Sequence, residues 1–370
     1  MLFTRIAPAF AVAMVFAGQA VATGAQLPGV AGERSWTLEA TGGFGVVTAV
    51  ERCSNMLFVA DTHQQIRRFD MAADRLLGDF GKGRAALATA LAVDCQRRRL
   101  FVITGIPLSR NAAAAVQVFD LDSEDLLREY PLPAKFLPRP GGRFEPPTSV
   151  IVSGLWVPPG RAPSDLIQVP AAQYYDGLRL GVKLSLETGN VEPLLVPYET
   201  KCIGAGQCPD VRIDAAMLPQ GPVRVAALPT STAIGIYDAR TSMPRLVDVR
   251  SPRYVRNGVN LEPGDHVDAR MKWLGENSTL SHLFAFAEGV VAVHARPEIG
   301  PGYHVGQSTP FRTYMNVYGW DGKSRARDVS LPELAVGRDD DHVYAIDYGA
   351  EGRRDGAQKI RLVQIGIWGK

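Results

Sequence analysis

The chain has 370 residues, of which 46% are hydrophobic and 21% charged, a composition typical of a globular protein rather than a disordered or fibrous one. Its formal net charge is only +2, which gives no broad basic field, so we expect no nucleic-acid partner. With 37 Gly and 26 Pro, the chain is rich in the residues that separate many short strands.

The N-terminal segment predicts export. Arg5 supplies a positive start, Ala9–Ala17 an apolar stretch, and Ala20-Val21-Ala22 a small-residue cleavage site. The apolar stretch is well short of the about 20 residues of a transmembrane helix, and no later segment is long and apolar enough to span a membrane. We therefore expect a signal peptide at 1–22, a single domain at 23–370, and a secreted or periplasmic protein whose four Cys can form disulfides.

The most regular stretch is Met56–Phe80, which reads MLFVADTHQQIRRFDMAADRLLGDF. An apolar run ends at Asp61, an alternating strand containing Ile66 and Phe69 follows, and a turn leads to a last strand. The pattern predicts consecutive antiparallel strands joined by tight turns.

This stretch resembles a blade of the NHL-repeat β-propellers, whose usual form is YVAD…N.RI.VFD..G..L..FG. The corresponding positions here are Phe58-Val59-Ala60-Asp61, Arg67-Arg68-Phe69-Asp70 and Phe80-Gly81. The likeness is clear over residues 46–131, and residues 100–131 also resemble yellow/royal-jelly proteins, which are propellers too. The resemblance implies an all-β, six-bladed propeller of secreted bacterial type, with a seven-bladed ring as the alternative.

The module repeats along the chain at a fixed offset of about 43 residues, the mark of a propeller or a similar array. Ala49-Val50 and Leu57-Phe58-Val59 recur as Ala92-Val93 and Leu100-Phe101-Val102. The last module lacks one strand, and Trp36–Ala40 is a strand without a module. We expect Trp36–Ala40 to supply the outer strand of the sixth blade and so to close the ring.

The connections between predicted strands fall into two classes. Turns after the first and third strand of each module are short. Links after the second and fourth strand, which open on the other face, are long, and these include Pro158–Leu178, Pro197–Val211, Arg250–Ser281 and Arg296–Arg312. Long loops in compact domains often carry function, so we expect the long-loop face to bind a ligand.

Aromatic and amide side chains in two of these loops suit a polar small molecule, a glycan or a peptide. The candidate ligand-binding residues are Tyr174, Tyr175, Asp176, Tyr303, His304 and Gln307, together with His63 next to the second strand of the best module. Asp61 precedes His63, and we expect its carboxylate to accept hydrogen bonds from nearby backbone N–H groups.

The sequence holds no HxH or HExxH spacing, so we expect no metal and no other cofactor. If an ion binds, Ca or Zn held by Asp265, Asp268 and His304 is the arrangement that the sequence offers. His282 and His294 fall in strand patterns and are interpreted as ordinary strand residues. Asp339-Asp340-Asp341 lacks the spaced oxygens of a calcium loop, and we expect a solvated hairpin tip there.

The four Cys predict two disulfides. Cys202 and Cys208 lie close together in a glycine-rich stretch, and we expect them to close a small loop. Cys53 and Cys95 occupy equivalent short turns of neighbouring modules, which predicts a staple between the first two blades if their Cα atoms come within about 7 Å.

The sequence leaves two main functional interpretations, besides a third in which the protein is a structural envelope component with no small ligand. The first, which we favour, is a monomeric, non-catalytic scaffold that binds a protein, a glycan or a small polar ligand through its long-loop face. The second is a metal-dependent hydrolase of lactonase type, or a lyase, with its site at the mouth of the central tunnel. The resemblance allows both, because propellers of this type include interaction scaffolds and metal-dependent enzymes.

Overall fold

The computed structural model describes residues 30–63, 66–81, 84, 88–104, 115–131, 166–169, 182–193, 212–227, 231–238, 244–256, 272–273, 275–298, 311–349 and 357–368. Apart from a short helical turn around Trp273, its secondary-structure elements there are β-strands, which confirms the prediction of an all-β chain. The described part contains no helix long and apolar enough to cross a membrane.

Most strands pair in chain order into antiparallel groups of four, here called quartets. The first quartet is β2 (Val47–Cys53), β3 (Met56–Asp61), β4 (Ile66–Asp70) and β5 (Arg75–Asp79). The second is β6 (Ala88–Asp94), β7 (Arg99–Thr104), β8 (Ala115–Asp120) and β9 (Leu126–Pro131). A group of three follows, β10 (Leu166–Val169), β11 (Val182–Ser185) and β12 (Val191–Pro193).

The C-terminal half adds three further quartets. The fourth group is β13 (Arg212–Leu218), β14 (Gly221–Ala227), β15 (Ala233–Asp238) and β16 (Arg245–Asp248). The fifth is β17 (Thr279–Ala285), β18 (Gly289–Pro297), β19 (Phe311–Gly319) and β20 (Ser324–Leu331). The closing quartet is β21 (Leu334–Arg338), β22 (His342–Asp347), β23 (Ala357–Ile367) and β1 (Val30–Phe44).

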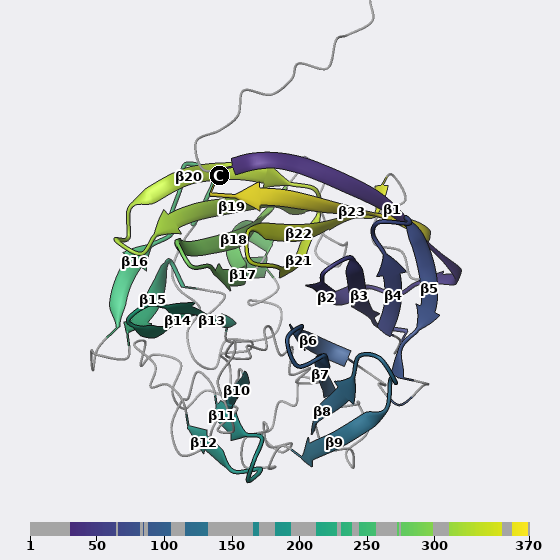
Figure 1. Cartoon of the computed structure of the whole chain (residues 1–370). Helices are drawn as coiled ribbons and strands as arrows, with labels where there is room; N and C mark the ends of the chain where they lie inside the picture. Colours follow the sequence, from purple (N-terminus) through teal and green to yellow (C-terminus); the bar gives the residue numbers. More distant parts are fainter. Residues whose placement is uncertain are drawn as a thin grey trace, which may run out of the picture.

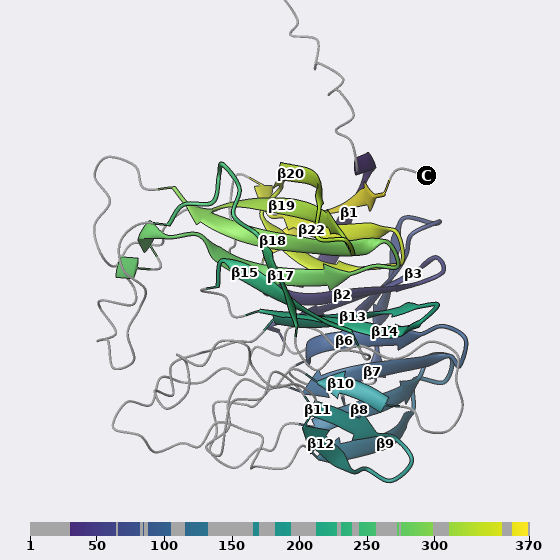
Figure 2. The ribbon, with the colours of Figure 1, turned by 90° about the vertical axis from the view of Figure 1, so that its left-hand side faces the viewer.

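The groups stand around a common centre in a propeller-like arrangement. Figure 1 shows the first strand of each group nearest the centre and the last strand at the rim, and Figure 2 shows the same groups from the side. Apolar core clusters lie between neighbouring groups, because strands buried on both faces carry continuous apolar runs. In β18, for example, Val290 and Ala292 pack toward the fourth group, whereas Val291 and Val293 pack toward the closing quartet.

The N-terminal strand closes the arrangement as predicted. β1 pairs antiparallel with β23, with Trp36 opposite Leu362, and is therefore the outer strand of the closing quartet. One parallel pair, Val50 with Gly337, then joins β2 of the first quartet to β21. A Cβ on Gly337 would lie 1.9 Å from the carbonyl oxygen of Val50, so only glycine permits this approach.

The third group differs from the sequence prediction. β10 lies inside Pro158–Leu178, which was predicted to be a loop, so that prediction is wrong. Its four residues stand between Pro163 and Pro170 and give too short a pattern to indicate a strand. Backbone pairing with β11 defines the strand instead.

The strand bounds agree with the predicted distribution of connection lengths. Six of the longest connections are of the second-to-third or group-to-group kind, and they span residues 105–114, 132–165, 194–211, 249–278, 298–310 and 348–356. The connection 170–181 joins the first two strands of the group of three and departs from this rule. The hairpins at the opposite strand ends are short, as between Cys53 and Met56 or between Leu218 and Gly221. The two ends of the sheets therefore differ in the length of the connections that join the strands.

Candidate functional site

A buried ion pair near the centre links two groups that are not neighbours in the chain. Arg338 ends β21, and its Nε and Nη2 donate to Oδ2 and Oδ1 of Asp214 on β13 at 2.6 and 3.1 Å. Nη2 also donates to the carbonyl oxygen of Ala215 at 3.0 Å, and the guanidinium lies 5.6 Å from the ring centroid of Phe286. The two side chains are only 20% and 8% exposed, so Arg338 acts as a cross-link at the centre.

Asp214 also binds the intervening fifth group. The backbone N–H of Ala285, the last residue of β17, donates to Asp214 Oδ2 at 2.8 Å, and the N–H of Ala215 donates to Oδ1 at 2.7 Å. Both carboxylate oxygens are thus satisfied by a guanidinium fork and two backbone donors. The carboxylate of Asp214 therefore holds the fourth, fifth and closing groups together.

Glu51 on β2 brings a second carboxylate close to this pair. Part of Glu51 remains accessible, yet protein atoms surround its carboxyl group, and this burial raises its pKa well above the ordinary value although the charge of Arg338 opposes the shift. Burial alone would lower the pKa of Arg338. The charges of Asp214 and Glu51 outweigh that effect and raise it. The centre is therefore a compact cluster of mutually compensating charges.

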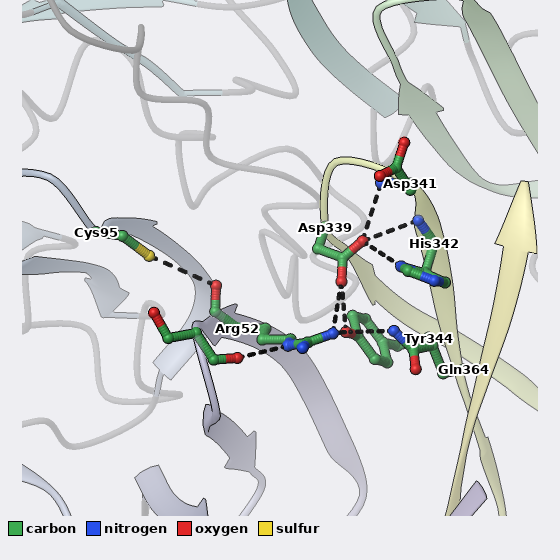
Figure 3. Close-up of polar contacts among 8 residues, drawn as sticks. Arg52, Cys95, Asp339, Asp341, His342, Tyr344 and Gln364 are labelled. Atoms are coloured by element: carbon green, nitrogen blue, oxygen red, sulfur yellow. Dashed lines mark hydrogen bonds and ion pairs between the residues drawn. The ribbon is translucent and has the colours of Figure 1, made fainter. Parts of the chain in front are cut away.

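A second polar cluster lies beside it, at the short turn between β21 and β22 (Figure 3). Oδ1 of Asp339 accepts from the backbone N–H groups of Asp341 and His342 at 3.0 and 2.9 Å and lies 2.8 Å from Nδ1 of His342. Burial disfavours the charged form of Asp339, but the hydrogen bonds from Tyr344, Asp341 and His342 prevail and lower its pKa. The expectation of a merely solvated hairpin tip is wrong for Asp339, whose side chain is 19% exposed.

The same carboxylate joins the closing quartet to the first quartet (Figure 3). Tyr344 donates its hydroxyl proton to Asp339 Oδ2 at 2.7 Å, and Arg52 Nη1 lies 3.3 Å from both that oxygen and the Tyr344 hydroxyl. Gln364 Nε2 donates to the Tyr344 hydroxyl at 3.3 Å. Because Arg52 belongs to β2, this network reinforces the contact made by Val50 and Gly337.

A third polar cluster lies between the fourth and fifth groups. His294 on β18 is 1% exposed, with its ring between those of Tyr254 and Tyr314 at centroid distances of 5.5 and 5.6 Å. Its Nε2 lies 4.0 Å from Oδ1 of Asp328, an oxygen to which the Ser251 hydroxyl donates at 2.5 Å. Burial lowers the pKa of His294 to about 4, although the charge of Asp328 opposes the shift. His294 is therefore a neutral, packed strand residue.

The structure places only one of the predicted ligand-binding residues. His63 follows β3, and its backbone N–H donates to Oδ1 of Asp61 at 2.9 Å. Oδ2 of Asp61 accepts from the N–H of Gly45 at 3.2 Å and pairs with Arg67, so the predicted backbone-tying role of Asp61 is confirmed. The other candidates lie outside the described residues, and these are Tyr174, Tyr175, Asp176, Tyr303, His304, Gln307, Asp265 and Asp268.

One of the two predicted disulfides falls within the described residues. Cys53 at the end of β2 is bonded to Cys95 after β6, with a Cα–Cα distance of 5.5 Å, which confirms the staple between the first two quartets. Cys202 and Cys208 lie outside the described residues. Among the residues that are described, no three His, Cys, Asp or Glu side chains are grouped so as to hold a metal ion.

A groove of about 550 Å³ lies at the rim, between β1 and the turn that joins β4 to β5. Its lining includes the buried side chains of Leu38 and Phe69 and the charged side chains of Glu39 and Lys359, whose carboxylate and ammonium groups pair at 2.6 Å. The groove contains none of the residues that the sequence predicted for binding.

The central charged residues were not singled out from the sequence. Asp214 and Glu51 interrupt apolar strand patterns, which is the one local signal that they carry. Nothing in the sequence pairs Asp214 with Arg338, because a contact between residues so far apart in the chain depends on how the groups are arranged in space.

Comparisons with known proteins support the fold alone. No family model matches the chain, and no curated protein matches it. A solved structure of a member of the DUF4221 family from Bacteroides vulgatus is similar with a TM-score of 0.64 at 11% identity, covering 92% of this chain and 98% of that one. Hydrazine synthase from Kuenenia stuttgartiensis has a TM-score of 0.44 at 13% identity over 81% of this chain and 73% of that one, too weak a likeness to carry an argument.

Proposed function

We propose that the protein is an exported, six-bladed β-propeller of NHL-like type that acts as a non-catalytic binding scaffold. The five quartets and the group of three supply the six blades, and β1 completes the last one. The ligand is a protein, a glycan or a small polar molecule. It binds at the strand ends where the longest connections join the sheets, which carry Tyr174, Tyr175, Asp176, Tyr303, His304 and Gln307.

The observation that carries this proposal is that the described charged side chains near the centre bind one another and the protein backbone. Arg338 and Asp214 satisfy each other, and Asp339 accepts from Tyr344, Arg52 and the backbone of its own turn. These groups tie sheets together, and each carboxylate oxygen of Asp214 and Asp339 already accepts at least two hydrogen bonds from the protein. A rigid frame with its longest connections at one end is the arrangement of a binding scaffold.

A metal-dependent hydrolase or lyase is the second candidate. Its support is that the carboxylates of Asp214 and Asp339 act electrostatically on Glu51 near the centre, and carboxylates are ligands for Ca or Zn, although the three do not form a metal-binding group in this arrangement. In this alternative, Arg338 would have to give up its fork with Asp214 before that carboxylate could bind an ion. The alternative therefore predicts that added metal competes with the Arg338–Asp214 pair.

The test is binding of the mature protein, residues 23–370, to a glycan array and to a random peptide array. A rim variant carries Tyr174→Ala, Tyr175→Ala, Tyr303→Ala and His304→Ala. A control variant carries Gln220→Ala and Lys323→Ala in short turns at the opposite strand ends, where both residues are exposed. The scaffold proposal predicts specific binding that the rim variant loses and the control keeps, at unchanged melting temperature. Loss in the control alone, or turnover of lactones or esters by the purified protein, would contradict it.

A further inference from the structure

The Cys53–Cys95 disulfide is asymmetric in its access to solvent. Cys53 ends a central strand and is 3% exposed, whereas Cys95 begins the β6–β7 turn and is exposed. Thiol–disulfide exchange requires an attacking thiolate to reach one of the two sulfurs, so the rate at each sulfur depends on its access. An incoming thiolate reaches Cys95 far more readily than Cys53.

The charges around the two sulfurs are asymmetric in the same sense. Nη1 of Arg98 lies 3.9 Å from Sγ of Cys53, while Nε and Nη2 of the same guanidinium pair with Asp122 at 3.2 and 2.5 Å. A guanidinium nitrogen at that distance stabilises a thiolate. Sγ of Cys95 instead lies 3.9 Å from the carbonyl oxygen of Arg52, whose partial negative charge disfavours a thiolate there (Figure 3). Cys53 is therefore the better leaving group.

We propose that Cys53–Cys95 is a directed thiol-exchange site, in which Cys95 is attacked and Cys53 leaves. A thiolate of a dithiol reductant forms a bond to Cys95 Sγ while the S–S bond breaks, and Cys53 departs as a thiolate beside Arg98. The second thiol of the reductant then displaces Cys95, so two electrons pass from the dithiol to the disulfide. The natural reductant is a protein dithiol, and the reaction is independent of any ligand bound at the long-connection ends.

The position of the site gives the exchange a structural consequence. Arg52, next to Cys53, holds Asp339 and Tyr344 of the closing quartet, and Cys95 belongs to the second quartet. The disulfide therefore joins the second quartet to the same strand that carries the contacts with the closing quartet. Its reduction removes a covalent restraint on this strand and should lower the melting temperature of the protein.

The experiment treats the folded full-length protein with glutathione, traps the products with acid and identifies the modified peptide by mass spectrometry. The proposal predicts a mixed disulfide on Cys95 and a free thiol on Cys53. Rates of reduction by dithiothreitol are then compared for the natural protein, Arg98→Gln, Arg98→Lys, and Arg97→Gln as a control with the same loss of charge in the same turn. Peptides that contain Cys202 and Cys208 are separated in the same spectra.

Arg98→Gln should slow reduction on the order of threefold for each unit by which the pKa of the leaving Cys53 rises. Arg98→Lys should recover most of the rate of reduction. Arg97→Gln should leave that rate unchanged. Melting temperatures of the oxidised variants show that each is folded before reduction. Glutathione on Cys53, equal rates for Arg98→Gln and Arg97→Gln, or resistance of the folded protein to dithiothreitol would each overturn the proposal.

Discussion

Arg338 and Asp214 form a two-point ion pair near the centre of the molecule, although they lie 124 positions apart in the chain. The pair has little exposure, so Arg338→Met would leave the charges of Asp214 and Glu51 buried without compensation. We predict a loss of about 3–5 kcal/mol in the free energy of unfolding. Urea unfolding followed by Trp fluorescence measures it.

Two further variants complete this test. Arg338→Met combined with Asp214→Asn should cost less than the sum of the two single changes, because each single change leaves the other group unpaired. Arg250→Ala removes an exposed pair with Asp248 and should not change the urea midpoint measurably. If the losses in the free energy of unfolding caused by Arg338→Met and Asp214→Asn simply add, the two residues do not act as a pair.

His294 should make stability depend on pH. Its pKa is lowered from the ordinary 6.5 to about 4 in the folded protein, so the unfolded chain binds the proton more readily. The contribution of neutral His294 to the stability of the folded protein is complete above pH 6.5. It is lost as the pH falls from 6.5 toward 4, because the unfolded chain then takes up the proton first. We predict a loss of about 2 kcal/mol in the free energy of unfolding between pH 7.5 and pH 5 that is attributable to this residue.

The groups that face His294 are Asp328, which favours its charged form, and Arg296, which opposes it. His294→Phe keeps a ring between Tyr254 and Tyr314 and removes the titration. Unfolding by urea at several pH values should therefore give a flatter profile for this variant. An unchanged slope would mean that other groups cause the pH dependence.

Gly337 should be intolerant of any side chain. A Cβ at this position would lie 1.9 Å from the carbonyl oxygen of Val50, which is backbone and cannot rotate away. We predict that Gly337→Ala separates β2 from β21 and costs on the order of 1–3 kcal/mol in the free energy of unfolding. Hydrogen exchange should show faster exchange in β2 and β21 than in β18, and equal protection in all three strands would contradict the account.

Trp36 tests the closing role of the N-terminal strand. It is 7% exposed and packs into the core between the first and closing quartets. Trp36→Ala should cost about 3–5 kcal/mol in the free energy of unfolding, through lost burial and a residual cavity. Thr37→Ala, at the exposed neighbouring position, should have almost no effect. Similar costs for both changes would mean that β1 is not a structural part of the closing quartet.

Local patterns predicted the features that neighbouring residues determine. The repeat of Leu57-Phe58-Val59 as Leu100-Phe101-Val102 identified two quartets, and the unassigned strand around Trp36 identified the closure. The disulfide was predictable for the same reason, because Cys53 and Cys95 occupy equivalent turns of adjacent repeats. In each case the spacing along the chain carries the information.

Contacts between distant groups were not predictable in this way. Asp339 stands in a run of three Asp residues that indicates a solvated turn, yet Arg52 and Tyr344 bring it into the interface between two quartets. Asp214 and Arg338 likewise meet only because the fourth and closing groups face the same centre. Such pairs depend on the arrangement of whole sheets, which hydrophobic periodicity does not encode.

The most direct test of the scaffold proposal is the metal content of the mature protein. The protein is purified without chelators or metal-binding tags, soaked with Ca or Zn, desalted and analysed by elemental mass spectrometry alongside its melting temperature. The account predicts no stoichiometric ion and no rise in melting temperature, because Arg338 already occupies the carboxylate of Asp214. A stoichiometric ion that raises the melting temperature, and whose binding Asp214→Asn abolishes, would contradict it and support the metal-dependent enzyme.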